Sequence, residues 1–233
     1  MRFWVQKREE DPRGRQWEAV AAELGFAPAP DLAERLTEQF DLGGGQLAPI
    51  YRRADDGPPQ IVAFEHVVTR AGPLGRVVTW RTGVVVRAQE PHAPVPLRAS
   101  AKRHVVLEGL TAGRSGAERL DCSEDPSFDA TVSVFAREGL EAGPLLTAPV
   151  RSALRRLLSS TDEELSRGSR GARERIPRHG TGPAPSVAIG PRNLYLLLEG
   201  ENPFPLQALG GAIVDLLSLQ AALTAATRRG GAR

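Results

Sequence analysis

Cysteine is nearly missing from this sequence. Its 233 residues include a single one, Cys122, which therefore has no partner for an intramolecular disulfide. Folds that depend on disulfides belong to oxidising compartments, whereas a chain of this length can bury enough apolar surface to fold without covalent cross-links. The first eleven residues, MRFWVQKREED, also lack the apolar run of a secretory signal. We therefore expect a cytoplasmic protein.

Neither sign of charge dominates, and no long uninterrupted apolar run occurs. Lys and Arg together number 30 and Asp and Glu 28, a formal net charge of +2, so any site for anions must be local. The longest apolar stretch, residues 208–226, contains Asp215 and Gln220 and carries its apolar residues on one side. That pattern favours a helix docked on a core over a membrane span.

Catalytic and metal-binding motifs are missing as well. The histidines at positions 66, 92, 104 and 179 do not have the spacing of a zinc site. The glycines at positions 43–45 precede Gln46, not the Lys and Ser or Thr of a phosphate-binding loop. Glu65 and His66 are neighbours within a predicted strand, so they point to opposite faces and cannot act on one substrate. We expect no enzyme, and we predict no catalytic, cofactor-binding or metal-binding residue.

A short acidic segment, residues 121–129, admits two interpretations. It places Asp121, Glu124, Asp125 and Asp129 around Cys122. Such carboxylates could bind a divalent cation or act as general acid and base, or they could shape a solvated turn by accepting hydrogen bonds from nearby backbone N–H groups. Their spacing fits no calcium loop, which favours the turn. The negative charges should also disfavour the thiolate of Cys122.

Apolar residues at helical spacing predict several amphipathic helices. One covers residues 13–24, with Gly25 after its end, and a short second one runs from a capping Asp31 to Phe40 with Glu34 as capping partner. Others cover residues 147–158 and 206–223. Leu154 and Leu216 lie on the apolar stripes of these last two helices, so we expect both in the core.

Runs of β-branched and aromatic residues predict the strands. Residues 61–70 and 76–88 form one predicted hairpin, and residues 187–189 and 194–199 form another. A strand over residues 128–137 and a short edge strand over residues 97–99 complete the set. No strand–helix–strand rhythm repeats, so we predict an α+β fold in which antiparallel β-hairpins form a sheet with amphipathic helices packed on a face. Residues 1–96 and 97–233 form either two lobes or one domain.

The clearest break in composition is a polar insertion, residues 159–186. It begins with acidic residues and continues with the arginines Arg167, Arg170, Arg173, Arg175 and Arg178. A segment of this kind buries too little apolar surface to offset its ordering entropy, so we expect it to be mobile. It serves either as a solvated linker or as a flexible contact to the phosphates of a nucleic acid or another polyanion.

Several segments resemble an uncharacterised bacterial domain family. An acidic turn with Asp125, Pro126 and Phe128 leads toward a strand, and Leu146 and Thr147 open the next helix. An earlier hairpin and a final hairpin and helix follow the same order, so the resemblance covers about residues 50–226. It implies a fold but no activity and no catalytic residues. Members of that family often follow amino-terminal membrane helices, and this sequence has none.

These observations predict a non-enzymatic protein-interaction or scaffold module whose partner is another protein. The alternative is a protein that binds nucleic acid or another polyanion through residues 167–178. The sequence carries no indication of the oligomeric state.

Overall fold

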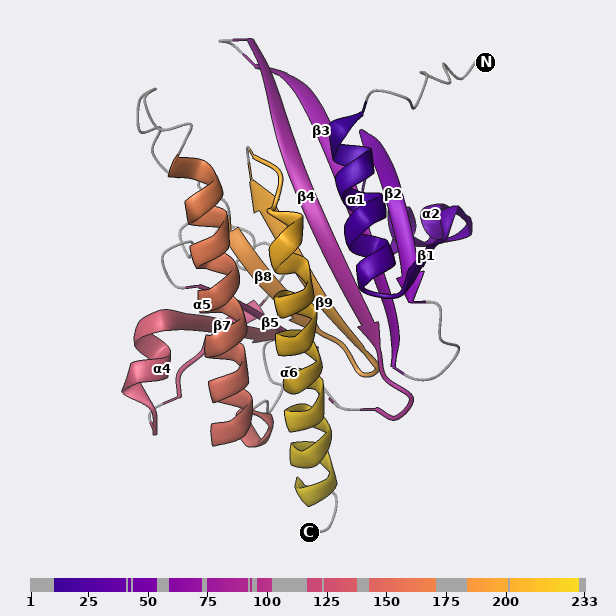
Figure 1. The fold of residues 1–233 in the computed structure, drawn as a ribbon. Helices are drawn as coiled ribbons and strands as arrows, with labels where there is room; N and C mark the ends of the chain where they lie inside the picture. Colours follow the sequence, from indigo (N-terminus) through magenta and orange to yellow (C-terminus); the bar gives the residue numbers. More distant parts are fainter. Residues whose placement is uncertain are drawn as a thin grey trace.

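The computed structural model of the chain describes residues 11–40, 42, 44–53, 59–72, 75–91, 93, 96–101, 117–122, 124–137, 143–170, 184–200 and 202–230. Within these residues the fold is α+β, as predicted: one antiparallel sheet has helices packed on both of its faces (Figure 1).

The sheet contains nine described strands. They are β1 (Phe26–Pro28), β2 (Gln46–Arg53), β3 (Gln60–Gly72), β4 (Gly75–Arg87), β5 (Leu97–Ala101), β6 (Ala117–Leu120), β7 (Val132–Arg137), β8 (Ala184–Ile189) and β9 (Asn193–Gly200). Their order across the sheet is β1-β2-β3-β4-β9-β8-β5-β7-β6. Strands from both sides of residue 96 therefore share one sheet, joined where β4 pairs with β9.

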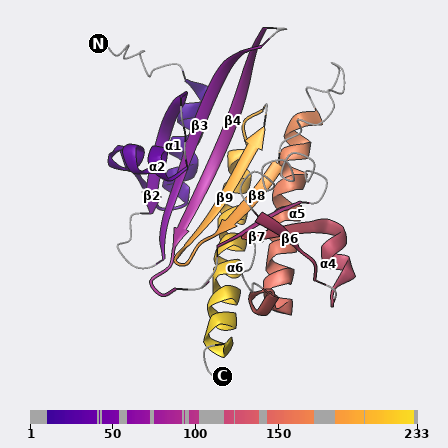
Figure 2. The same ribbon diagram turned by 180° about the vertical axis from the view of Figure 1, so that it is seen from behind.

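The helices are α1 (Pro12–Glu23), α2 (Ala33–Gln39), α4 (Pro126–Thr131), α5 (Ala148–Arg170) and α6 (Leu209–Gly230), with 3-10 turns at Pro30–Leu32, Gly143–Leu145 and Leu206–Ala208. Helices α1, α5 and α6 lie on one face of the sheet (Figure 1), which we call the front. Helix α2 lies on the opposite face, the back (Figure 2).

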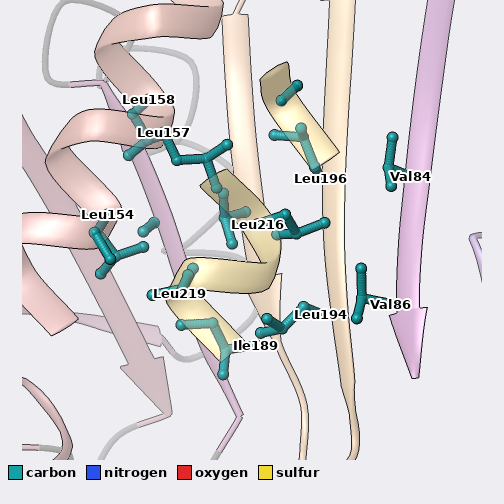
Figure 3. Close-up of a cluster of buried hydrophobic side chains, with 14 of the residues drawn as sticks. Val84, Val86, Leu154, Leu157, Leu158, Ile189, Leu194, Leu196, Leu216 and Leu219 are labelled. Atoms are coloured by element: carbon teal, nitrogen blue, oxygen red, sulfur yellow. The ribbon is translucent and has the colours of Figure 1, made fainter. Parts of the chain in front are cut away.

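The main core fills the space between the front of the sheet and its helices. Figure 3 shows Leu154 and Leu157 of α5 beside Leu216 and Leu219 of α6. Strand residues complete this layer: Val84, Val86, Ile189, Leu194 and Leu196. Leu154 and Leu216 are fully buried, which confirms the two predicted stripes. Each such side chain contributes about 1.5–3 kcal/mol of transfer free energy, so apolar burial holds α5 and α6 on the sheet.

A smaller core lies under α2 on the back. Leu36 of α2 packs there with Ile50, Phe64 and Val85 of the sheet. Phe64 faces Gly83 on the neighbouring strand, where a Cβ atom would stand 2.2 Å from the ring. Only glycine leaves room for this ring, so α2 can pack closely on the back of the sheet.

Helix α1 forms as its sequence predicts. Asp11 caps its start by accepting a hydrogen bond from the backbone N–H of Arg13, and Gly25 follows its end with a φ of 72°. On its inner side Trp17 is buried and stacks on Tyr51 of β2, with ring centroids 5.8 Å apart. The second helix is also present, but Leu32 precedes it without a side-chain cap, so the capping pair of Asp31 and Glu34 is wrong.

Two strand predictions need correction. Residues 128–131 belong to α4, not to a strand, because Pro126 starts a helical turn that Asp125 caps. Only residues 132–137 of the predicted strand are extended. The segment that begins at Leu97 is not an edge strand, since β5 pairs with β7 on one side and with β8 on the other. Its residues include no proline, so both of its edges can form ladder hydrogen bonds.

The polar insertion was predicted to begin at residue 159, which is too early in the sequence. Helix α5 continues past Leu158 to Arg170, so residues 159–170 are helical. Thr161 and Leu165 are buried, and the Thr161 hydroxyl donates a hydrogen bond to the carbonyl of Leu157 at 2.7 Å. These two residues extend the apolar stripe by two turns, although the surrounding composition is polar. The other end also differs, because β8 begins at residue 184, and residues 171–183 lie outside the described part of the chain.

By length and composition alone, Leu206–Arg229 is apolar enough to cross a membrane. In this structure one side of the segment contributes Leu209, Leu216, Leu219 and Leu223 to the core. The opposite side is open, and Val214 is 61% exposed there. The predicted docked helix and its one-sided pattern are therefore both present.

Candidate functional site

The β3–β4 hairpin extends beyond the rest of the sheet. Residues 68–72 of β3 and 75–79 of β4 pair with each other up to Gly72 and Gly75, and we call these residues the β-arm. Pairing of β2 with β3 ends at Gln46 and Val67, and pairing of β9 with β4 begins at Gly200 and Trp80. The β-arm therefore projects as a two-stranded ribbon of about 16 Å at the upper end of the view in Figure 1.

Both outer edges of the β-arm lack a neighbouring strand among the described residues. Strand edges of this kind present backbone N–H and C=O groups that can pair with another chain. An isolated two-stranded hairpin is at best marginally stable in water. The β-arm thus has the geometry of a segment that gains stability from an additional strand.

The side chains of the β-arm are apolar, basic or those of Thr69 and Thr79, and none is acidic. Val77 is 42% exposed, one of only two large hydrophobic residues to be so exposed in the described part of the chain. Arg70 and Arg76 are exposed, and neither contacts an acidic side chain among the described residues. Between Glu65 and Glu90 the chain contains no acidic residue at all. The β-arm consequently combines an exposed apolar residue with uncompensated positive charge.

On the front, the root of the β-arm is fixed by a buried ion pair. Arg13 of α1 donates from Nε to Oε2 of Glu65 at 3.0 Å, and its Nη2 donates to the carbonyl of Phe204 at 2.9 Å. The Glu65 side chain is 2% exposed. One guanidinium therefore connects α1, β3 and the segment before α6 at the level where the β-arm begins.

On the back, His66, Arg81 and Glu199 form a row across β3, β4 and β9. Arg81 donates from Nε to Glu199 at 2.8 Å. His66 is buried, and its Nε2 lies 2.9 Å from the carbonyl of Gly44, so Nε2 must be the protonated nitrogen. Burial lowers the pKa of His66, and nearby Arg81 lowers it further, while the Gly44 hydrogen bond and Glu199 act in the opposite direction. The imidazole is accordingly held neutral beneath the turn that leads into β2.

As predicted, Glu65 and His66 face opposite sides of the sheet, so they do not form a joint site. Thr82 of β4, which pairs with Glu65 and faces the front, is fully buried, and its hydroxyl has no hydrogen-bond partner among the described residues. Of the polar groups at the root of the β-arm, Glu65, His66 and Thr82 are therefore buried, whereas the Glu199 side chain is 42% exposed.

The structure places part of the predicted arginine cluster. Arg167 and Arg170 belong to the last turns of α5, while Arg173, Arg175 and Arg178 fall outside the described residues. The end of α5 and the β-arm lie at the same end of the molecule (Figures 1 and 2). Residue 184, where the chain resumes, pairs with Glu199, which itself pairs with Arg81 at the root of the β-arm. The two arginine-bearing segments are thus on one side of the fold.

The acidic segment has the geometry of a capped turn. Asp125 accepts hydrogen bonds from the Ser127 hydroxyl at 2.6 Å and from the backbone N–H of Phe128 at 3.0 Å, and Arg151 lies 3.2 Å away. The Ser127 hydrogen bond is the main reason that the pKa of Asp125 is lowered. Asp129 accepts from the backbone N–H of Cys122 at 2.9 Å. These contacts satisfy the carboxylates locally.

No group of three or more His, Cys, Asp or Glu side chains suited to a metal ion occurs within the described ranges. His92, His104 and His179 lie outside those ranges. The carboxylates at Asp121 and Asp125 are instead close to arginines, Arg119 at 3.8 Å and Arg151 at 3.2 Å.

A second surface feature is an open hollow beside the carboxyl-terminal half of α6. It is lined by small and apolar side chains together with two arginines: Pro59, Leu217, Gln220, Ala221, Thr224, Ala225, Arg228 and Arg229. Arg228 donates to Glu90 at 2.7 Å, so one of these cations is paired. Binding sites for small molecules are usually enclosed and hold several convergent polar groups. This hollow is open to solvent instead.

No protein-family model, no curated protein and no solved structure matches this chain. The resemblance to an uncharacterised bacterial domain family therefore stays a prediction.

The β-arm was not predicted as a site, although its hairpin was. Two signals in the sequence point to it: the absence of acidic residues from His66 to Gln89, and the exceptional length of the hairpin around Pro73 and Gly75. The projection itself depends on where β2 and β9 end, and neither endpoint has a strong sequence signal.

Proposed function

We propose that this chain is a non-enzymatic interaction module that binds another protein through the β-arm. The observation that carries the proposal is the projection of residues 68–72 and 75–79 beyond their neighbouring strands. An exposed Val77 beside Arg70 and Arg76 suits a surface that is covered in a complex. The ion pair of Arg13 with Glu65 supports the same proposal, because it holds the root rigid and thereby limits the entropy lost on binding.

A site-specific photo-crosslink tests this function. A photoreactive amino acid replaces Val77 in the native cell, and the matched control replaces Glu18, an exposed residue on the outer side of α1. We expect Val77 to give a discrete protein adduct that Glu18 does not give. A shortened variant, with an Asn-Gly turn joining Val68 to Thr79 in place of residues 69–78, should fold and no longer bind the protein found in the adduct. Equal adducts from both positions, or none from Val77, would contradict the proposal.

A second candidate function is binding of nucleic acid or another polyanion. The observation that favours it is the shared location of the β-arm arginines, Arg70 and Arg76, and the end of α5 with Arg167 and Arg170. Contacts between arginines and phosphates release condensed counterions, so such binding weakens steeply as salt rises.

Fluorescence anisotropy with single- and double-stranded oligonucleotides at two salt concentrations measures this second function. The comparison variant changes Arg167, Arg170, Arg173, Arg175 and Arg178 to Ser. Equal affinity of the two proteins would remove these arginines from consideration, and a loss confined to the variant would favour polyanion binding.

A further inference from the structure

We infer that the partner contributes an extended strand that pairs with the outer edge of β4 at residues 75–79 and places an acidic side chain opposite Arg76. This inference rests on the proposed function and specifies the partner's chemistry. It describes strand addition to a free sheet edge, in which backbone hydrogen bonds provide affinity and side chains provide selectivity.

The position follows from the ends of the strands. β9 runs along β4 only from Arg87 to Trp80, where its Gly200 is the last residue in register. β4 continues to Gly75 with β3 on its other side. A strand added along residues 75–79 would lie in line with β9 and extend the sheet. On β3 the apolar residue Val68 is already buried, and Thr69, Arg70 and Ala71 offer less apolar surface than Val77 and Val78.

Alternation along β4 defines what the added strand meets. Val84 and Val86 face the front core, so Arg76, Val78 and Trp80 share the front side, while Val77 and Thr79 face the back. A complementary strand therefore has apolar residues opposite Val77 and Val78, and a carboxylate opposite Arg76. Opposite charges and apolar pairs are the favourable cross-strand combinations.

Charge distinguishes an acidic partner from a second copy of this chain. Pairing two β4 edges in antiparallel register around Val77 would place the Arg76 side chains of both copies diagonally across one face, and no acidic residue of the β-arm would offset them. Like charges at such short range are unfavourable. An acidic strand converts Arg76 into an attractive cross-strand contact, so it is the favoured occupant.

The test uses synthetic peptides of valine and threonine that carry one glutamate at the position opposite Arg76, with a matched peptide that carries lysine there. Binding of the fluorescent peptides to the full chain is measured by anisotropy. We expect the glutamate peptide to bind about fivefold more tightly than the lysine peptide, the scale of one cross-strand charge pair. Arg76→Glu should reverse this preference, and Arg70→Glu on the other strand, the matched control, should leave it in place.

Two further peptides, N-methylated on the amides of either the odd or the even residues, report the backbone contacts. Only one set of amides points toward β4 in a strand pair, so one of these peptides should lose binding and the other should keep it. Equal binding of both, no binding of any peptide, or a preference unchanged by Arg76→Glu would overturn the inference. Binding of duplex oligonucleotides in place of peptides would overturn it in favour of polyanion binding.

The photo-crosslink at Val77 and the peptide titration distinguish the proposed interaction function from the inferred strand addition. If Val77 crosslinks to a discrete protein while no peptide binds, the interaction function stands and strand addition fails. If neither result is positive, both fail.

Discussion

The guanidinium of Arg13 lies against the carboxylate of Glu65, with Nε 3.0 Å from Oε2, and both groups are largely removed from solvent. The pair joins the first turn of α1 to the middle of β3. Because the same arginine also reaches the carbonyl of Phe204, the contact fixes three segments that are distant in the sequence.

Removing Arg13 should destabilise the protein strongly. Arg13→Ala leaves the Glu65 carboxylate buried without its cation, and breaking a buried pair in this way costs about 3–5 kcal/mol. Urea denaturation measures the free energy of unfolding. The control is the double variant that combines Arg13→Ala with Glu65→Gln, because it leaves no buried negative charge. A loss below about 1 kcal/mol for Arg13→Ala would show that water reaches the carboxylate.

The stability of the protein should decrease as the pH falls below about 6.5 because of His66. Its pKa is lowered from 6.5 in the folded chain, chiefly by burial, so between the two pKa values the unfolded chain binds a proton that the folded chain does not. The folded state is therefore favoured at higher pH and loses this advantage as the pH decreases. The nearby charged groups are Arg81 on β4 and Glu199 on β9.

Urea denaturation at pH values from about 7.5 to 5 checks this effect, with His66→Gln as the control. An amide at this position can still donate to the carbonyl of Gly44 but does not titrate. The wild-type chain should lose more stability over this range than His66→Gln. If the free energy of unfolding changed equally with pH in the two proteins, the pH dependence would belong to other groups.

Truncation of the core leucines should be costly. Leu154 and Leu216 are fully buried on facing helices, so Leu→Ala at either position should reduce the free energy of unfolding by about 2–5 kcal/mol. Val214→Ala on the exposed side of α6 is the matched control and should change it by less than about 0.5 kcal/mol. Similar values for all three would contradict the assignment of the inner side of α6.

Cys122 should react slowly with alkylating reagents. Burial raises the pKa of its thiol, and the Asp129 carboxylate raises it further. Because the thiolate is the reactive form, labelling by iodoacetamide at about pH 8 should be slower in the folded chain than in the denatured chain. Asp129→Asn removes the nearby negative charge and should increase the rate. Mass spectrometry follows the adduct, and a folded rate equal to the denatured rate would show an accessible thiolate.

The parts of this fold that depend on neighbours in sequence follow from the sequence, and the parts that depend on distant neighbours do not. The β3–β4 and β8–β9 hairpins have turn residues between two runs of strand formers, and α1 has a cap and a terminal glycine. The pairing of β4 with β9 leaves no such signal, because Trp80 and Gly200 meet only when the whole sheet assembles. Strands β1, β2 and β6 were not predicted for the same reason.

Competition between local sequence signals explains the remaining differences between the predicted and the observed elements. Phe128 suits a strand by propensity, but Asp125 and Pro126 start a helical turn that includes it. Leu165 continues the stripe of α5 within a segment whose composition is that of a linker. In the candidate site, the hairpin was predictable, whereas its projection was not, since Val67 and Trp80 are ordinary strand residues that happen to be the last ones paired with β2 and β9.

The position of β9 has a consequence for synthesis on the ribosome. β4 is complete once residue 87 has been made, but the strand that covers its second edge ends at Gly200. While the intervening residues are translated, the edge from Trp80 to Arg87 stays open, and open edges promote association between nascent chains. A protein truncated before β8 should therefore form inclusion bodies on expression, even though every residue of its first four strands is present.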